Sequence, residues 1–362
     1  MHQLEGYTDG TDKVCHLLKM LYGLRQSGCK WNNEFNKGMW FIGFKRLLSD
    51  PCAYLHQSKD DFQIITVWVD DLMIFTNSNM GMHNIKLQIA QQWKVKDLGE
   101  PAKIIGIEIK HTHNTVSISQ KKYIETLLKK EGTECANPVA MSLDANVPIE
   151  PNPDHFKGLA MTTYVWLLGK IQYIANATRS DIFFATHRLA SFTRNLSMQH
   201  MGMLKRVLWY LAGTRNYTIT YHKFYTPTAP LIGYADATHA NTDERKLSTG
   251  TVFLLAGGAI SWRFTKQTLL ALSTTEVEYI AFSIAGTDAR WLTNLYNKLG
   301  FPLKPLLPMR SDSLGAIANS ANLYMSKQTR HIDLKWYSVW QLINYKIMYP
   351  SHVGMQTRLP MY

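Results

Sequence analysis

Two adjacent aspartates, Asp70 and Asp71, lie between apolar runs in the stretch QIITVWVDDLMIFTNS. The flanking runs are rich in β-branched and aromatic residues, so they predict two strands of a hairpin with the aspartates at its bend, in a place that looks buried. Side chains alternate along a strand, so one carboxylate can face a cleft while the other supports it. Two ionised carboxylates there need a compensating cation, and Mg²⁺, which binds carboxylates and phosphates together, is the natural one. A second pair, Asp60 and Asp61, lacks an apolar strand on each side and is interpreted as a solvated turn.

Three further acids form a second candidate group in the C-terminal part of the chain. Asp236 ends the strand-like IGYADA, Glu278 comes early in a long predicted helix containing STTEVEY, and Asp312 follows the strand-like LLPMRS. A strand, a helix and a strand end can bring three carboxylates to one edge of a sheet, where they would hold Mg²⁺ for phosphodiester hydrolysis. From spacing alone, three unrelated surface acids are the favoured interpretation, with Glu278 simply stabilising the helix N-terminus.

The elements that must position these acids follow from periodicity and turn residues. A length of 362 residues predicts two or three domains. Apolar residues at helical spacing run from about residue 14 to 44, with a break near Gly28, and residues 102–120 predict another strand pair. A short helix is expected at residues 121–132, and three further helices are expected within residues 164–214. From about residue 228, strands, a long helix ended by Gly300, a strand and a helix predict an α/β domain.

Composition and charge limit the class of protein. The chain is 46% hydrophobic and carries a net charge of +12, which indicates a globular protein with a polyanionic partner, nucleic acid before membrane. No apolar run reaches the roughly 18 residues of a membrane span, and no signal peptide is apparent at the start. The four cysteines lack metal-ligand or disulfide spacing, so a reduced intracellular protein is expected. His111 and His113 are interpreted as surface residues, and six tryptophans as core: Trp31, Trp166, Trp209, Trp262, Trp291 and Trp336.

A set of motifs in a fixed order resembles one family. LYGLRQSGCKW, VWVDDLMIF, DLGEPAKIIGIEI, ISQKKYIETLL, GYADA, LSTTEVEYIA and SDSLGAIA occur in that order. With them the chain resembles the C-terminal part of the Pol polyprotein of copia-type LTR retrotransposons, over nearly its whole length. The resemblance implies an α+β polymerase palm at residues 1–135, a linker and helical thumb or connection at 136–227, and an α/β ribonuclease H-like domain at 228–362.

The same resemblance implies roles for individual residues. Asp70 and Asp71 match the metal-binding pair of a reverse transcriptase palm, Gln26 matches a glutamine that contacts nucleotide and template, and Gly106 lies in a segment similar to the primer grip. The three later acids match catalytic, metal-binding carboxylates of ribonuclease H, which reverses the interpretation from spacing: Asp236, Glu278 and Asp312. The implied cofactor is Mg²⁺, with Mn²⁺ as the alternative ion.

The implied function is RNA-directed DNA synthesis followed by cleavage of the RNA in RNA–DNA hybrids, by two-metal phosphoryl transfer. The implied partners are an RNA template, a DNA primer, deoxynucleotides and the hybrid, with no membrane. The implied location is intracellular, either cytoplasmic, in a virus-like particle, or nuclear.

Several positions depart from the family pattern. The chain begins within a segment that follows the family's first palm aspartate, so that aspartate and the fingers are expected to be absent. Thr238 and His239 replace an Asp and a Trp, and Thr357 aligns where the family has its fourth ribonuclease H carboxylate, whereas Asp333 matches a different position. Two functions therefore stay open, with enzyme activity undecided between them: a truncated reverse transcriptase and ribonuclease H, or an inactive relic that at most binds nucleic acid.

Overall fold

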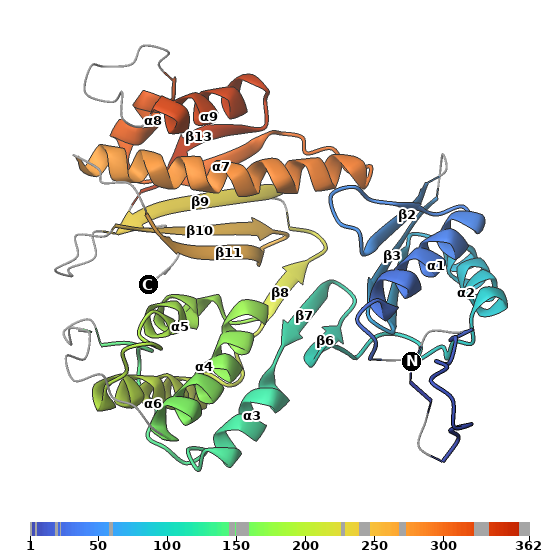
Figure 1. The fold of residues 1–362 in the computed structure, drawn as a ribbon. Coiled ribbons are helices and arrows are strands. Elements are labelled where there is room, and N and C mark those ends of the chain that lie inside the picture. The colour runs from blue at the N-terminus through green and yellow to red at the C-terminus, as the bar shows by residue number, and fades with distance from the viewer. Residues whose placement is uncertain are drawn as a thin grey trace. The chain divides into compact units, whose positions relative to one another are not determined.

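The computed structural model of the chain describes residues 2–3, 6–18, 21, 23–57, 61–144, 149, 159–225, 229–238, 247–267, 273–321 and 333–354. The chain forms two compact units, Met1–Gly99 and Glu100–Tyr362, and the first is blue to cyan in Figure 1. Within the described residues, no helix is long and apolar enough to cross a membrane.

The first unit is a four-stranded antiparallel sheet with two helices. The sheet order is β1–β2–β3–β4, formed by Lys45–Arg46, Ala53–Gln57, Phe62–Trp68 and Asp71–Thr76. Helices α1 (Ser27–Phe41) and α2 (Asn79–Gln92) share a core with the sheet. That core is made of Phe35, Met39, Phe44, Tyr54, Ile65, Val67, Ile85 and Ile89. The hairpin predicted around the paired aspartates is confirmed as β3 and β4.

The first helix begins later than its apolar pattern predicted. Gly28 lies inside α1 rather than at a break, and α1 starts only at Ser27. Gly23 adopts a φ of 90°, so the chain turns in the left-handed region just before the helix. The apolar residues before this turn therefore belong to no helix in the part of the chain that the structure describes.

The second unit begins with a small antiparallel sheet and a group of helices. The sheet order is β5–β6–β7–β8, formed by Lys103–Ile104, Ile107–His111, Thr115–Ser119 and Ile219–His222. The helices are α3 (Lys121–Lys130), α4 (Leu159–Ala177), the 3₁₀ turn η1 (Ser180–Ile182), α5 (Phe183–Ala190) and α6 (Met198–Gly213). Their shared core includes Ile124, Leu128, Tyr164, Leu168, Ile171, Leu204 and Leu208. The predicted strand pair and helices are thus confirmed, and His111 and His113 are exposed as expected.

A buried arginine joins the helices of this group. The Arg179 side chain is only 2% exposed, and it forms a two-pronged ion pair with Asp181 at 2.7 and 2.8 Å. The guanidinium also donates to the backbone carbonyl of Thr214 at 3.0 Å and to Thr214 Oγ1 at 2.5 Å, while Tyr210 Oη donates to Asp181 at 2.8 Å. Because every charge in this group is paired, the network fixes where α4 ends relative to α6.

A mixed five-stranded sheet forms the rest of the second unit. The order is β11–β10–β9–β12–β13, made of Gly258–Lys266, Ser248–Leu255, Leu231–Thr238, Leu307–Ser311 and Met348–His352. Strand β10 pairs antiparallel with both β11 and β9, whereas β12 pairs parallel with both β9 and β13. Helix α7 (Thr274–Lys298) lies against β9 and β10, and α9 (Asp333–Asn344) and α8 (Leu314–Ala321) contact α7 (Figure 1). The predicted α/β character of this region is confirmed.

The tryptophans were expected in the core, and four of the six are exposed instead. Trp336 is 6% exposed and packs in the core beside α7. Four others are between 36% and 47% exposed, namely Trp31, Trp166, Trp209 and Trp291. Trp166, for example, lies under the ammonium group of Lys170, 3.2 Å from the ring centroid. Amphipathic indole rings can cover surface in this way, so an apolar sequence pattern alone does not place them inside.

Candidate functional site

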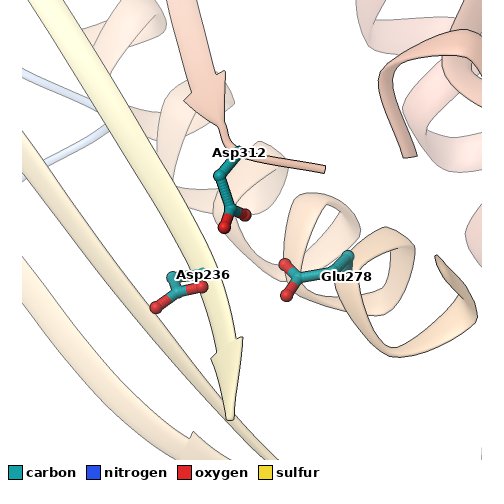
Figure 2. Close-up of side chains that lie close together, drawn as sticks. All are labelled: Asp236, Glu278 and Asp312. Atoms are coloured by element: carbon teal, nitrogen blue, oxygen red, sulfur yellow. The ribbon is translucent and has the colours of Figure 1, made fainter. Parts of the chain in front are cut away.

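Three carboxylates converge in the second unit, each from a different element. Asp236 comes from β9, Glu278 from α7, and Asp312 directly follows β12, as Figure 2 shows. Each side chain offers one oxygen that lies within 4.8 Å of the others, and all three side chains are half-buried. The structure thus brings together the acids that spacing alone left unrelated.

Strand register explains how the two aspartates meet. In the parallel pair of β9 and β12, Met309 is the partner of Gly233. Asp312 and Asp236 each lie three residues farther along their strands, so they arrive at the same level of the sheet. Neighbouring strands are about 4.8 Å apart, so side chains at the same level of paired strands are close enough for their carboxylates to meet.

The helix supplies the third carboxylate from its first turns. Ser273 caps α7 by accepting a hydrogen bond from the backbone N–H of Glu276 at 3.3 Å, and Glu278 lies two residues beyond Glu276, at the start of the second turn. The Glu278 carboxylate therefore reaches the two aspartates from the second turn of α7.

The donor set fits a hard divalent cation. Carboxylate oxygens are the ligands that Mg²⁺ and Mn²⁺ prefer, and opposite ligands of Mg²⁺ are about 4.2 Å apart. Oxygens that already lie within 4.8 Å of one another need little side-chain movement to meet that requirement. Three carboxylates at this distance also repel one another, and a cation removes this repulsion.

The paired aspartates of the first unit occupy an exposed hairpin turn. Trp68 pairs with Asp71 across β3 and β4, which leaves Val69 and Asp70 as the two turn residues. Both carboxylates are exposed, so the buried surroundings expected for them are wrong. Val69 adopts a φ of 55°, a conformation that costs a β-branched residue free energy and that clusters at functional sites. Among the described residues, no third metal-ligating side chain joins this pair.

Gln26 and Gly106 lie in separate units. Gln26 occupies the exposed N-cap position of α1. Gly106 forms the β5–β6 turn with Ile105, at φ values of 77° and 49°. A Cβ at Gly106 would lie 2.6 Å from the hydroxyl oxygen of Tyr173, which itself bonds the carbonyl of Ile105. Geometry therefore requires glycine there, while the roles implied for Gln26 and Gly106 stay predictions.

Some sequence-derived positions lie outside the described part of the chain. His239 and Thr357 are among them, and so are the side chains of Thr238 and Asp333. One residue that sequence reasoning missed is Gln267, which bonds the backbone next to Glu278. Only the tertiary structure reveals it, because it precedes Glu278 by eleven residues and belongs to no local motif.

Known proteins resemble the chain along its whole length. Residues 1–145 match the family model "Reverse transcriptase (RNA-dependent DNA polymerase)". The Pol polyprotein from transposon TNT 1-94 of Nicotiana tabacum is 33% identical over 356 residues, which cover 95% of this chain and 26% of that protein. The Pol polyprotein from transposon RE1 of Arabidopsis thaliana is 31% identical over 367 residues, which cover 99% of this chain and 24% of that protein.

A solved structure, that of LC11-RNase H1 in complex with RNA/DNA hybrid, is 15% identical and covers 35% of this chain and 86% of that chain, with a TM-score of 0.28. The chain spans about a quarter of the length of the curated relatives it matches. From the ordered motifs and these relatives, the chain belongs to the copia-type retrotransposon Pol family, with a reverse transcriptase region at residues 1–145 and a C-terminal α/β domain built on a mixed five-stranded sheet.

Proposed function

We propose that the second unit cleaves the RNA strand of RNA–DNA hybrids at the carboxylate cluster. The observation that carries this proposal is the convergence of Asp236, Glu278 and Asp312 within 4.8 Å. Such a cluster is the donor set that phosphodiester hydrolysis needs, because a bound divalent ion stabilises charge on the phosphate oxygens and lowers the pKa of a bound water.

The carboxylates of the chain would act by holding a divalent ion and orienting the phosphate that it binds. Asp236 and Asp312, level with each other on paired strands, provide a fixed pair of oxygens, and Glu278 closes the site from the helix side. A second metal needs a further carboxylate, and the hydroxyl of Thr357, at the aligned position, is a weak ligand for a hard dication. We therefore expect cleavage to require high metal concentrations and to prefer Mn²⁺, whose geometry is less strict than that of Mg²⁺.

The distribution of charge supports a nucleic-acid partner. Residues 159–227 contain eight Lys and Arg residues but a single acid, Asp181, which is paired with Arg179. Most of the net charge of +12 thus comes from the helical part of the second unit. We expect binding to phosphates that weakens steeply as salt rises, because each contact releases condensed counterions.

Cleavage of a labelled RNA strand in a hybrid tests this function directly. The wild-type chain should cut weakly at high Mn²⁺, Asp236→Asn should abolish cutting, and Thr357→Asp should increase it. Full activity of the unmodified chain at low Mg²⁺ would refute the assignment of Thr357. If neither the wild type nor Thr357→Asp cuts, but both still bind hybrid, the inactive relic is the better description.

For the reverse transcriptase region, descent is shown by the family match over residues 1–145. We propose Asp70 and Asp71 as its metal-binding pair, with Gln26 and Gly106 as contacts to template, nucleotide and primer. Because the described residues place no third acid beside the pair, we expect the 362-residue protein to show no primer extension on an RNA template. Template-dependent extension that disappears in Asp70→Asn would overturn this expectation.

A further inference from the structure

Gln267 joins three elements around the carboxylate cluster. It follows the last residue of β11, is 5% exposed, and its backbone N–H donates to the carbonyl of Leu247 at 2.7 Å. Its side-chain amide donates to Thr249 Oγ1 at 2.9 Å and to the carbonyl oxygen of Val277 at 3.1 Å. Because a backbone carbonyl can only accept, the orientation of the Gln267 amide is fixed.

The two hydrogen-bond partners of the Gln267 amide lie next to the cluster in different ways. Val277 immediately precedes Glu278 in α7. Thr249 immediately precedes Gly250 in β10, and Gly250 pairs with Asp236 across β9 and β10. One buried side chain therefore connects the backbone next to the helix carboxylate with the strand that flanks the first aspartate.

The helix carboxylate needs such a connection more than the other two. Asp236 and Asp312 are kept level by the register of β9 and β12. The backbone hydrogen bonds of a helix run along its own axis, so the distance of Glu278 from the strands depends on side chains. Repulsion between the three carboxylates acts to increase that distance whenever no cation is present.

A second anchor acts on the other neighbour of Glu278, but it leads elsewhere. Tyr279 stacks on Trp336 with ring centroids 4.6 Å apart, and its hydroxyl donates to the Trp336 carbonyl at 3.3 Å. This contact attaches α7 to α9 rather than to the strands that carry the aspartates. Of these two contacts beside Glu278, the hydrogen bond from Gln267 is the one that leads to β10, where it adds to the core packing between α7 and the sheet.

We infer that Gln267 is a positioning residue of the carboxylate cluster, holding Glu278 at metal-binding distance from Asp236 and Asp312. This inference rests on the proposed function, since it takes the cluster to bind a divalent cation. Gln267 acts through the α7 backbone and touches neither metal nor substrate. Loss of comparable supporting contacts in metal sites costs about 10–100-fold in metal affinity.

The test uses the full chain with Gln267→Met, which keeps the side-chain length but removes the amide. Mn²⁺ binding is measured by titration, and hydrogen exchange of α7 amides is measured in the metal-free protein. The matched control is Thr251→Val, because Thr251 Oγ1 is buried in β10 and bonds none of the described residues. Thr249→Val, which removes one of the two bonds made by the amide, is a milder variant in case Gln267→Met fails to fold.

We expect Gln267→Met to weaken Mn²⁺ binding about tenfold or more and to speed exchange at the start of α7. Thr249→Val should show a smaller loss, and Thr251→Val should bind like the wild type. Equal Mn²⁺ affinity in Gln267→Met and wild type would overturn the inference, and so would equal losses in Gln267→Met and Thr251→Val. If Thr249→Val has to serve alone, wild-type affinity in that variant overturns the inference.

Asp236→Asn separates this inference from the proposed function. If Asp236→Asn binds Mn²⁺ as tightly as the wild type, the cluster is not the metal site and both proposals fail. If Asp236→Asn loses Mn²⁺ but the wild type cuts no hybrid, only the cleavage function fails. The affinity of Gln267→Met still decides the positioning role in that case.

Discussion

Neutralising one acid of the cluster should make the metal-free protein more stable. In Asp236→Asn, two repulsive carboxylate pairs disappear while the shape of the side chain is kept. The oxygens lie within 4.8 Å of one another. At that separation each pair repels by about 0.9 kcal/mol in bulk water and by about 3.5 kcal/mol at an effective dielectric constant near 20. Because the side chains are half-buried and salt roughly halves the repulsion at this distance, we expect a gain of about 1–4 kcal/mol for the two pairs together.

Urea unfolding in a chelating buffer measures this gain, and repeating it at high salt tests its cause. The increase in free energy of unfolding should shrink as salt screens the repulsion. Added Mn²⁺ should stabilise the wild type, because an ion that binds only the folded state shifts the equilibrium, and it should leave Asp236→Asn unchanged. A suitable control is Glu125→Gln in α3, where an exposed acid pairs with Lys121 at 3.9 Å and removal of its charge should change little.

Two results would refute this reasoning about the cluster. The first is a metal-free Asp236→Asn protein that is less stable than the wild type, which would mean that the acids attract stabilising partners more than they repel one another. The second is equal stabilisation of both proteins by Mn²⁺, which would place the metal elsewhere.

Three other changes test the fold around the site. Arg179→Met should lower the free energy of unfolding of the helical part by about 3 kcal/mol, because it leaves Asp181 without its buried partner. Loss of helical circular dichroism in urea measures this free energy. A decrease of less than about 1 kcal/mol would contradict the prediction. Gly286→Ala places a Cβ 2.4 Å from Leu342 Cδ1. We expect lower stability, because the overpacking cost of about 1–3 kcal/mol should outweigh the roughly 1 kcal/mol gain in helix propensity. A higher melting temperature would contradict this and show that α9 shifts to make room. Burial and the nearby Asp181 carboxylate raise the pKa of Tyr210 from 10.0 to about 12. The stability that the neutral Tyr210 hydroxyl contributes is therefore present below pH 10 and is lost as pH rises from 10 to 12. Tyr210→Phe should weaken the fall in free energy of unfolding over this pH range, and an unchanged fall would assign it to other tyrosines.

Local sequence patterns predicted most of the elements, and the ordered motifs predicted the family. Apolar runs rich in β-branched and aromatic residues predicted the β3–β4 hairpin, and the apolar pattern ended by Gly300 predicted α7, because residue type and periodicity reflect how each local element is buried. The ordered motifs identified the family without any structure. Where the local signal was ambiguous it failed, as with the start of α1 and with the exposed tryptophans such as Trp166, because burial depends on what packs against a residue from elsewhere in the chain.

Long-range strand pairing, which no local pattern specifies, brings the three distant acids together. Asp236 and Asp312 meet because β9 and β12 pair in parallel in a register that puts Met309 beside Gly233, and no local pattern specifies the register of strands some seventy residues apart. Glu278 joins them because α7 is set against β10, partly through the hydrogen bond from Gln267. Long-range pairing brings the carboxylates within reach of one cation, whereas their spacing along the chain reads as three unrelated surface charges.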